Sequence, residues 1–402
     1  MSAYGAVLRA PGVARIIAAQ LTARMPWGMV SLAVLLHVQH VHHSYGAAGL
    51  VLAGNGVGQA ISGPLLGRLM GVRGMRPVLI ATTAVCAAMM LLIALVVMPL
   101  PMTMGVALVM GLSGPPVTPA VRTIYPKMVN SSLLTPLFSL DAAAQELIWV
   151  LGPVLITFVS TQVSTVLGLL ICAGFLVGGG AWFISLPELG RVRIPRSKRR
   201  FGIVLRRPTI LVATATGFLL IGSYAAVEAG VIAAFPGQGV EAGIILAISS
   251  VGSLTAGLAF GNLPLGPWAL ARRMAVVFFG VALAAAWLNF WWMALALAIA
   301  GAGIAPALAA MSTQVSSSVK FSDTAEAYGW VNTGQLIGAG IGSAIAGGLI
   351  DGHGAVGAFW VSAAAAGVGI LVPAAFVRWL PDMRGKHAGP IPDTEPIPLD
   401  LS

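Results

Sequence analysis

The sequence predicts an all-α integral membrane protein of twelve transmembrane helices, arranged as two related six-helix halves. Three observations predict this fold class. Of the 402 residues, 58% are hydrophobic and only 8% are charged, whereas soluble globular proteins carry about 25% charged residues. Basic residues occur in alternate loops only, and part of the first half of the chain is repeated in the second. We therefore expect most side chains to face lipid or other helices.

A membrane-spanning helix needs about 20 mostly apolar residues. Apolar runs of this length recur along the chain, separated by short polar loops. They lie at about 14–37, 45–67, 77–97, 101–121, 137–160, 164–186, 209–233, 241–262, 272–290, 292–313, 325–350 and 355–379. Each run predicts one transmembrane helix.

The basic residues predict the orientation. With twelve spans, they all share the side of the chain termini: Arg9, Arg15, Arg68, Arg73, Arg76, Arg122, Lys127, the run from Arg191 to Arg207, Arg272, Arg273, Lys320, Arg378, Arg384 and Lys386. Since loops rich in Lys and Arg stay in the cytoplasm, both termini are expected there. The net charge of +10 then reflects these loops. No nucleic-acid-binding module accompanies it, and the run from Arg191 to Arg207 is expected to contact anionic lipid headgroups.

Segment 47–69 aligns without gaps on segment 241–263, and Gly111 and Pro116 recur at matching spacing as Gly301 and Pro306. The repeat predicts an N-terminal half at 1–186, a basic linker at 187–208 and a C-terminal half at 209–380. The tail at 381–402 is expected to be disordered, because it is rich in Pro and acidic residues and has no apolar period. Two parallel halves of this kind are typical of transporters that bind substrate between them, near the bilayer midplane.

The stretch GRLMGVRGMRP, residues 67–77, contains Gly67, Gly74 and Arg76 in the pattern found between helices 2 and 3 of the major facilitator superfamily. Gly71 replaces the acidic residue of that pattern. The chain resembles this superfamily over nearly its whole length. Segments 111–129 and 138–153 are similar to helices 4 and 5 of drug and metabolite efflux members of high-GC bacteria. The resemblance implies the major facilitator fold and drug:proton antiport.

Charged side chains inside a bilayer are costly, so each calls for an explanation. Arg24 lies about ten residues into its helix, or ~15 Å, and Glu146 lies at a similar depth, so we expect the two to pair. Glu146 then either binds and releases a proton, with Arg24 responding to its charge, or forms a fixed ion pair.

Two further carboxylates lie in predicted helices. Asp141 is about one turn from the cytoplasmic end of its helix, where Arg122 can reach it, either as a gate or as a static pair. Glu228 lies beside Tyr224 near the outer end of its helix. It is a second protonation site, an outer gate or a solvated helix end.

Neutral polar residues inside the spans are candidates for lining the substrate cavity, and equally for hydrogen bonds between helices: Gln20, Asn55, Gln59, Gln145, Asn332 and Gln335. His37, His40, His42 and His43 are expected in an outer loop. No metal site is expected there, because no carboxylate or thiol accompanies them. No cofactor is expected either.

The leading hypothesis is a monomeric secondary transporter of the bacterial inner membrane that exports small lipophilic molecules in exchange for protons. Proton-coupled uptake of a nutrient or metabolite is the alternative. An enzyme would need a nucleophile with its base or a metal cluster at one depth, and a sensor would need an added cytoplasmic domain. The sequence offers neither, so we expect no enzyme.

Overall fold

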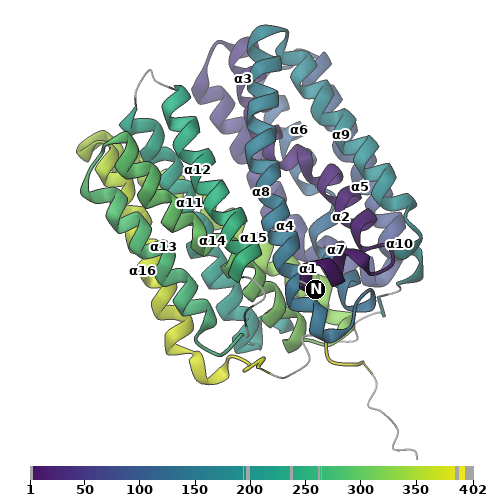
Figure 1. Ribbon diagram of the computed structural model, residues 1–402. Coiled ribbons are helices and arrows are strands. Elements are labelled where there is room, and N and C mark those ends of the chain that lie inside the picture. Colours follow the sequence, from purple (N-terminus) through teal and green to yellow (C-terminus); the bar gives the residue numbers. More distant parts are fainter. Residues whose placement is uncertain are drawn as a thin grey trace, which may run out of the picture.

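The computed structural model describes residues 3–192, 194–195, 200–235, 239–260, 263, 265–384 and 389–393. Nearly all of them are helical, and they form two bundles that lie side by side (Figure 1). The first half comprises α1 (Ala3–Arg9), α2 (Val13–Arg24), η1 (Met25–Gly28), α3 (Val30–His42), α4 (Tyr45–Arg73), α5 (Met75–Leu95), α6 (Leu100–Leu112), α7 (Val117–Ile124), η2 (Tyr125–Lys127), α8 (Ser131–Gln162), α9 (Thr165–Ser185) and α10 (Pro187–Arg191). The second comprises η3 (Ile203–Arg206), α11 (Pro208–Ala234), α12 (Gly239–Phe260), α13 (Ala269–Ala286), α14 (Phe290–Ser318), η4 (Phe321–Asp323), α15 (Thr324–His353), α16 (Ala355–Ala375) and η5 (Val377–Trp379).

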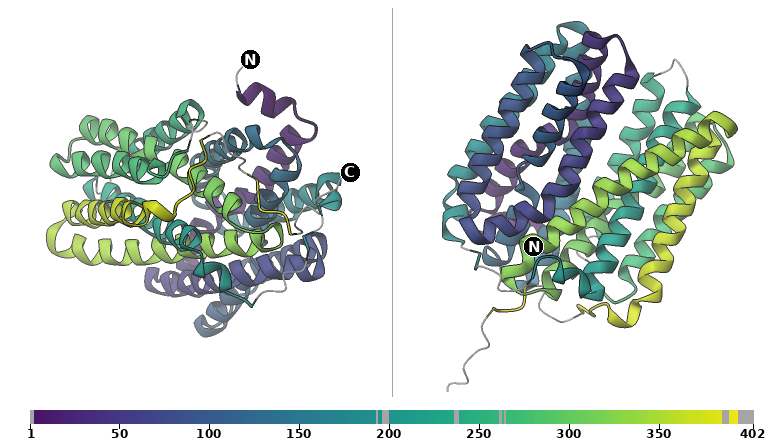
Figure 2. Two further views of the ribbon diagram at one scale, coloured as in Figure 1. Left: turned by 90° about the horizontal axis from the view of Figure 1, so that it is seen from below. Right: turned by 180° about the vertical axis from the view of Figure 1, so that it is seen from behind.

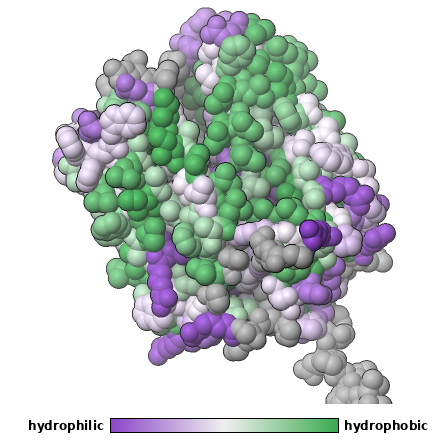
Figure 3. Space-filling model, viewed as in Figure 1, coloured by the Kyte–Doolittle hydropathy of each residue, from purple (hydrophilic) through white to green (hydrophobic). Residues whose placement is uncertain are grey.

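Within the described residues, 11 segments are long and apolar enough to cross a membrane. The 29-residue helix α4 adds a further span of sufficient length, although Asn55, Gln59 and its many glycines make it less apolar. These helices coincide with the expected spans, so the all-α membrane fold is confirmed. On the face shown in Figure 3 the surface is largely hydrophobic, with hydrophilic residues concentrated toward the two ends.

Two of the spans are interrupted. The first consists of α2 and α3 joined by the 3₁₀ turn η1, and Pro26 lies in that turn. The fourth consists of α6 and α7, separated by a segment that contains Pro115 and Pro116. Proline lacks the N–H group that an α-helix needs in its interior and crowds the preceding turn. An arginine lies close to each break. Arg24 directly precedes the first, and Arg122 lies less than two helical turns after the second.

The internal repeat reappears in the packing of the helices. A Cβ atom on Gly111 of α6 would lie 2.1 Å from the backbone oxygen of Asn55 in α4, and one on Gly301 of α14 would lie 2.1 Å from that of Ser249 in α12. Asn55 and Ser249 are aligned positions of the two repeats, as are Gly111 and Gly301. The two halves therefore use equivalent glycines to bring equivalent helices together. The bounds of the halves, at residues 186 and 209, stay a prediction.

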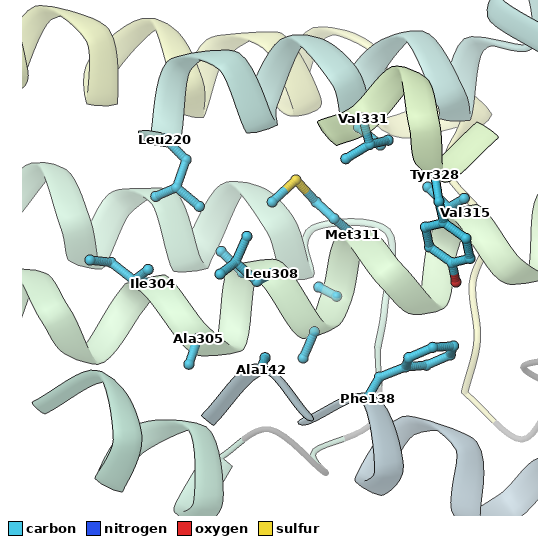
Figure 4. Close-up of a cluster of buried hydrophobic side chains, with 14 of the residues drawn as sticks. Phe138, Ala142, Leu220, Ile304, Ala305, Leu308, Met311, Val315, Tyr328 and Val331 are labelled. Atoms are coloured by element: carbon cyan, nitrogen blue, oxygen red, sulfur yellow. The ribbon is translucent and has the colours of Figure 1, made fainter. Parts of the chain in front are cut away.

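The halves meet on the side of the molecule that holds α1 and the described tail residues 389–393, here called the terminal side. The two bundles diverge toward the opposite side (Figure 2, right). Phe138 and Ala142 of α8 face α14 and α15 across this junction (Figure 4). Hydrogen bonds join the halves at the pairs Arg68–Glu326, Ser139–Gly257, Thr333–Ala60 and Glu146–Ser253.

The tail was expected to be disordered from residue 381. Among its described residues, Ile391 pairs with the backbone of the loop between α14 and α15. The expectation of disorder stays a prediction, and this backbone pairing is a contact that the polar composition of the tail does not reveal. Part of the basic linker, Arg193, Arg196, Lys198 and Arg199, lies outside the described residues, so its contact with lipid headgroups stays a prediction.

Candidate functional site

Asp141 is the centre of a buried polar cluster in the first half, here called the Asp141 cluster. Its side chain is 0% exposed. Gln20 Nε2 and Tyr125 Oη each donate to Asp141 Oδ1 over 3.0 Å. Arg122 Nε lies 3.3 Å from Oδ2 and Arg24 Nη1 lies 3.5 Å from Oδ1. Two guanidinium groups therefore share one carboxylate, and the expected pairing of Asp141 with Arg122 is present.

Arg24 pairs with Asp141 and not with Glu146, so the expected Arg24–Glu146 pair is wrong. Arg24 also donates to Gln20 Oε1 over 2.8 Å and to Gln145 Oε1. Asp141 and Glu146 are five residues apart, which places them about 140° apart around an α-helix. Asp141 faces α2 and α7, whereas Glu146 faces the second half.

Glu146 forms a hydrogen bond between the halves. Ser253 of α12 donates to Glu146 Oε1 over 2.8 Å, and Ser253 Oγ itself accepts a 3.0 Å hydrogen bond from the backbone N–H of Ala305, next to Pro306 in α14. The Glu146 side chain is buried, at 9% exposure. It lies at the middle of the 32-residue helix α8, hence near mid-membrane. The Glu146 carboxyl group thus connects α8 with α12 directly and with α14 through the Ser253 hydroxyl group.

Ser253 was not among the residues that the sequence singled out. The signal was present, because the alignment of segments 47–69 and 241–263 places Ser253 at the position of Gln59. Gln59 was a cavity candidate, and its repeat partner is the residue that contacts Glu146. A hydroxyl group on a small side chain gives no charge or periodicity signal by itself.

Glu228 of α11 is exposed. Tyr224 lies one turn before it in α11, within electrostatic range of both Glu228 and Glu146. Carboxyl groups from both halves are therefore near Tyr224. Beside it, a small pocket is lined by Ser223, Tyr224, Ser249 and apolar side chains of α11, α13 and α14.

The neutral candidates separate into two groups. Gln20 and Gln145 belong to the Asp141 cluster. The other four lie elsewhere: Asn55 is buried where α4 meets α6, and Gln59, Asn332 and Gln335 are half-buried.

On the terminal side, Glu326 at the start of α15 accepts hydrogen bonds from α4 and from the linker. Arg68 Nη1 of α4 lies 3.3 Å from Glu326 Oε2, and the backbone N–H of Gly202 in the linker donates to Oε1 over 2.7 Å. The pairing of Arg68 with Glu326 was not predicted from the sequence, because the two residues are far apart in the chain.

The loop motif between α4 and α5 has a structural role in this arrangement. Gly67 packs against the backbone oxygen of Ala325 in α15. Gly74 ends α4 with a φ of 89°, which favours glycine. Arg76 donates to the backbone oxygen of Leu186 over 2.9 Å.

The four histidines do not form the expected loop, because α3 continues to His42. His37 is buried and bonded to Thr165 Oγ1 at 3.1 Å and to the backbone oxygen of Ile93 at 3.0 Å. Among the described residues, no group of three or more His, Cys, Asp or Glu side chains could hold a metal ion.

Comparison with known proteins agrees with the fold. The family model of the Major Facilitator Superfamily matches residues 16–271 and 237–399. Curated protein sequences give no match. A crystal structure of the human organic anion transporter MFSD10 (TETRAN) superposes with a TM-score of 0.68 at 14% identity, covering 93% of this chain and 100% of that one.

A crystal structure of a bacterial homologue of the iron transporter ferroportin, in an outward-facing state, has a TM-score of 0.72 at 13% identity. It covers 91% of this chain and 98% of that one. At such identities the two structures show a shared fold alone, and the substrates named for them are theirs.

Proposed function

Because the chain belongs to the Major Facilitator Superfamily, and is therefore a multi-pass membrane transporter and not an enzyme, we propose that it is a proton-coupled exporter of small lipophilic molecules. In this proposal the terminal side faces the cytoplasm of a bacterial cell, and Glu146 carries the coupled proton.

The hydrogen bond between Glu146 and Ser253 is the observation that carries the proposal. A charged carboxylate without a cationic partner is costly in a membrane, whereas a protonated carboxyl is a neutral hydrogen-bonding group. Within the described part of the chain, the hydrogen bond found for Glu146 comes from a neutral hydroxyl group. Glu146 lies between the halves. We therefore expect it to bind a proton while the terminal side is closed and to release the proton when the halves rearrange.

The Asp141 cluster suits a different role. Its two arginines are held by one carboxylate and two glutamines within the first half, so it keeps α2, α7 and α8 in fixed register. It reaches the second half through Arg122, whose guanidinium carbon lies 5.9 Å from the centre of the Tyr328 ring in α15. Rigid halves are what alternating access by rocking requires.

The composition of the helices beside Glu146 favours a lipophilic substrate. The charged residue of α11 is Glu228 and that of α12 is Glu241. Neither helix contains a Lys or an Arg. A phosphate or dicarboxylate substrate would call for basic side chains there. The resemblance of segments 111–129 and 138–153 to efflux proteins supports export as the direction.

The proposal is tested with the full chain in proteoliposomes that carry a pH gradient and an internal pH dye. Lipophilic cations, neutral antibiotics and sugars are added in turn to wild type and to Glu146→Gln. We expect lipophilic compounds to trigger proton movement that Glu146→Gln abolishes and that Glu188→Gln, a matched change outside the spans, keeps. A response to sugars alone would instead establish uptake by symport.

A further inference from the structure

The loop between α14 and α15 binds the tail of the chain in an extended conformation. The backbone N–H of Ile391 donates to the oxygen of Val319 over 2.9 Å, and the N–H of Phe321 donates to the oxygen of Ile391 over 3.1 Å. Lys320 and Ile391 thereby form a parallel β-bridge. The tail thus pairs with the loop through backbone hydrogen bonds, the kind of contact by which extended peptides add to sheet edges.

A charged side chain fixes the register of this pairing. Asp393 Oδ1 accepts hydrogen bonds from Ser322 N at 3.2 Å and from Ser322 Oγ at 2.6 Å. The Ile391 side chain is 40% exposed, so its backbone makes the contact. The site therefore recognises an extended backbone followed, two residues later, by a carboxylate.

The loop that binds the tail also connects the two halves. Lys127 Nζ of the first half lies 4.6 Å from the centre of the Phe321 ring. From the linker, Arg207 Nη1 donates to the oxygen of Ser318 over 2.6 Å. Five residues after Phe321, Glu326 binds Arg68 of the first half. Any opening of the terminal side has to move this loop away from α4 and η2.

We propose that the loop from Val319 to Ser322 is a docking site for the chain's own residues 389–393, and that docking holds the terminal side closed. The tail fixes the backbone of Phe321 while the Phe321 ring contacts Lys127. Release of the tail frees the loop, lowers the stability of the closed arrangement and raises the population that is open on the terminal side. This inference does not depend on protons or on the nature of the substrate.

The test measures the distance between two nitroxide labels on the terminal side by pulsed electron paramagnetic resonance. The labels are attached to Arg73→Cys at the end of α4 and Arg272→Cys in α13, in a chain whose two buried cysteines, Cys86 and Cys172, are replaced by Ala. Both labelled residues are exposed and belong to different halves. The full chain is studied in lipid nanodiscs, where longer distances report opening.

Two matched pairs of variants isolate the docking. Deletion of 389–402 removes the segment, whereas deletion of 394–402 keeps it. Ile391→Pro removes the N–H donor, whereas Ile391→Ala keeps the backbone. We expect Ile391→Pro, which removes one hydrogen bond, to raise the ratio of open to closed populations about fivefold, and deletion of 389–402, which removes four, to raise it at least about tenfold. The two controls are expected to match wild type.

Unchanged distance distributions in both deletion of 389–402 and Ile391→Pro would overturn the proposal. An equal shift in Ile391→Ala would overturn the claim that the backbone makes the contact. Circular dichroism and monodisperse elution of each variant distinguish opening from loss of fold. Because the readout is a distance and not transport, its outcome is independent of the role proposed for Glu146.

Discussion

Ser253 donates a 2.8 Å hydrogen bond to Glu146 across the two halves of the molecule. The donor belongs to α12 and the acceptor lies near the middle of α8. The same hydroxyl oxygen accepts the N–H of Ala305 in α14. The proposed function depends on this pair.

A double-mutant cycle tests the contact directly. We expect Glu146→Leu and Ser253→Ala to couple by about 1 kcal/mol in thermal unfolding of the purified protein, because one hydrogen bond has a net worth of that order and Leu cannot accept it. Thr255 is two residues further along α12, exposed, and hydrogen-bonded to its own helix. The cycle of Glu146→Leu with Thr255→Ala is expected to be additive, and coupling there would point to a general change in α12.

The Asp141 cluster predicts a large loss of stability in Asp141→Asn. The substitution leaves Arg24 and Arg122 buried without a counter-charge, which costs about 3–5 kcal/mol in comparable buried pairs. The measurement is the thermal unfolding midpoint in detergent. Adding Arg24→Gln to Asp141→Asn is expected to restore part of the loss, because one unpaired charge is removed. A double variant no more stable than the single one would contradict this reading of the cluster.

The repeated glycine contacts predict equal effects in the two halves. Gly111→Ala and Gly301→Ala each place a Cβ 2.1 Å from a backbone oxygen, so each is expected to destabilise the protein by about 1–3 kcal/mol. Gly105→Ala in α6 is the control, since a Cβ there meets nothing within 4 Å. Thermal unfolding of the three variants checks the prediction. Tolerance of both substitutions, or an equal loss in the control, would show that close helix approach is not what these glycines provide.

The ion pair of Arg15 with Glu188 predicts a dependence of stability on pH. Burial opposes ionisation of Glu188, but the hydrogen bond and positive charge of Arg15 outweigh it and lower the pKa of Glu188 below its ordinary value of 4.5. A carboxyl whose folded-state pKa is lowered stabilises the fold above its ordinary pKa, and the stabilisation is lost as the pH falls through the folded-state value.

Glu188→Gln is therefore expected to lower the unfolding midpoint at pH 7, by an amount that corresponds to about 1 kcal/mol or less because Arg15 is half exposed. The difference from wild type should shrink as the pH falls below the ordinary pKa of 4.5 and vanish below the lowered folded-state pKa. A difference that stays constant over this range would assign the effect to packing and not to charge.

Much of the fold follows from the sequence, and the reasons are physical. Lipid requires long apolar helices with internally satisfied backbones, so hydropathy alone locates the spans. The aligned glycines of the two repeats, such as Gly111 and Gly301, predict which helices approach closely. The interruptions at Pro26 and at Pro115 were not predicted, although proline is the cause in both cases.

The partners in the site were harder to predict. Depth along a helix follows from residue number, and on depth alone Arg24 and Glu146 match. Rotation about the helix axis decides contact, and a shift of one residue turns a side chain by about 100°. The sequence alone does not fix which face of α8 meets α2, so it could not tell Asp141 from Glu146 as the partner of Arg24. The docking of Ile391 depends on backbone groups, which no residue type reveals.

The central claim is that Glu146 carries the coupled proton. Its most direct test compares two assays in proteoliposomes: exchange of labelled substrate across a membrane without a gradient, and accumulation of that substrate driven by a pH gradient. If Glu146 carries the coupled proton, Glu146→Gln keeps exchange close to wild type and loses gradient-driven accumulation. Accumulation at the wild-type level in Glu146→Gln would contradict it and leave Glu146 with a structural role.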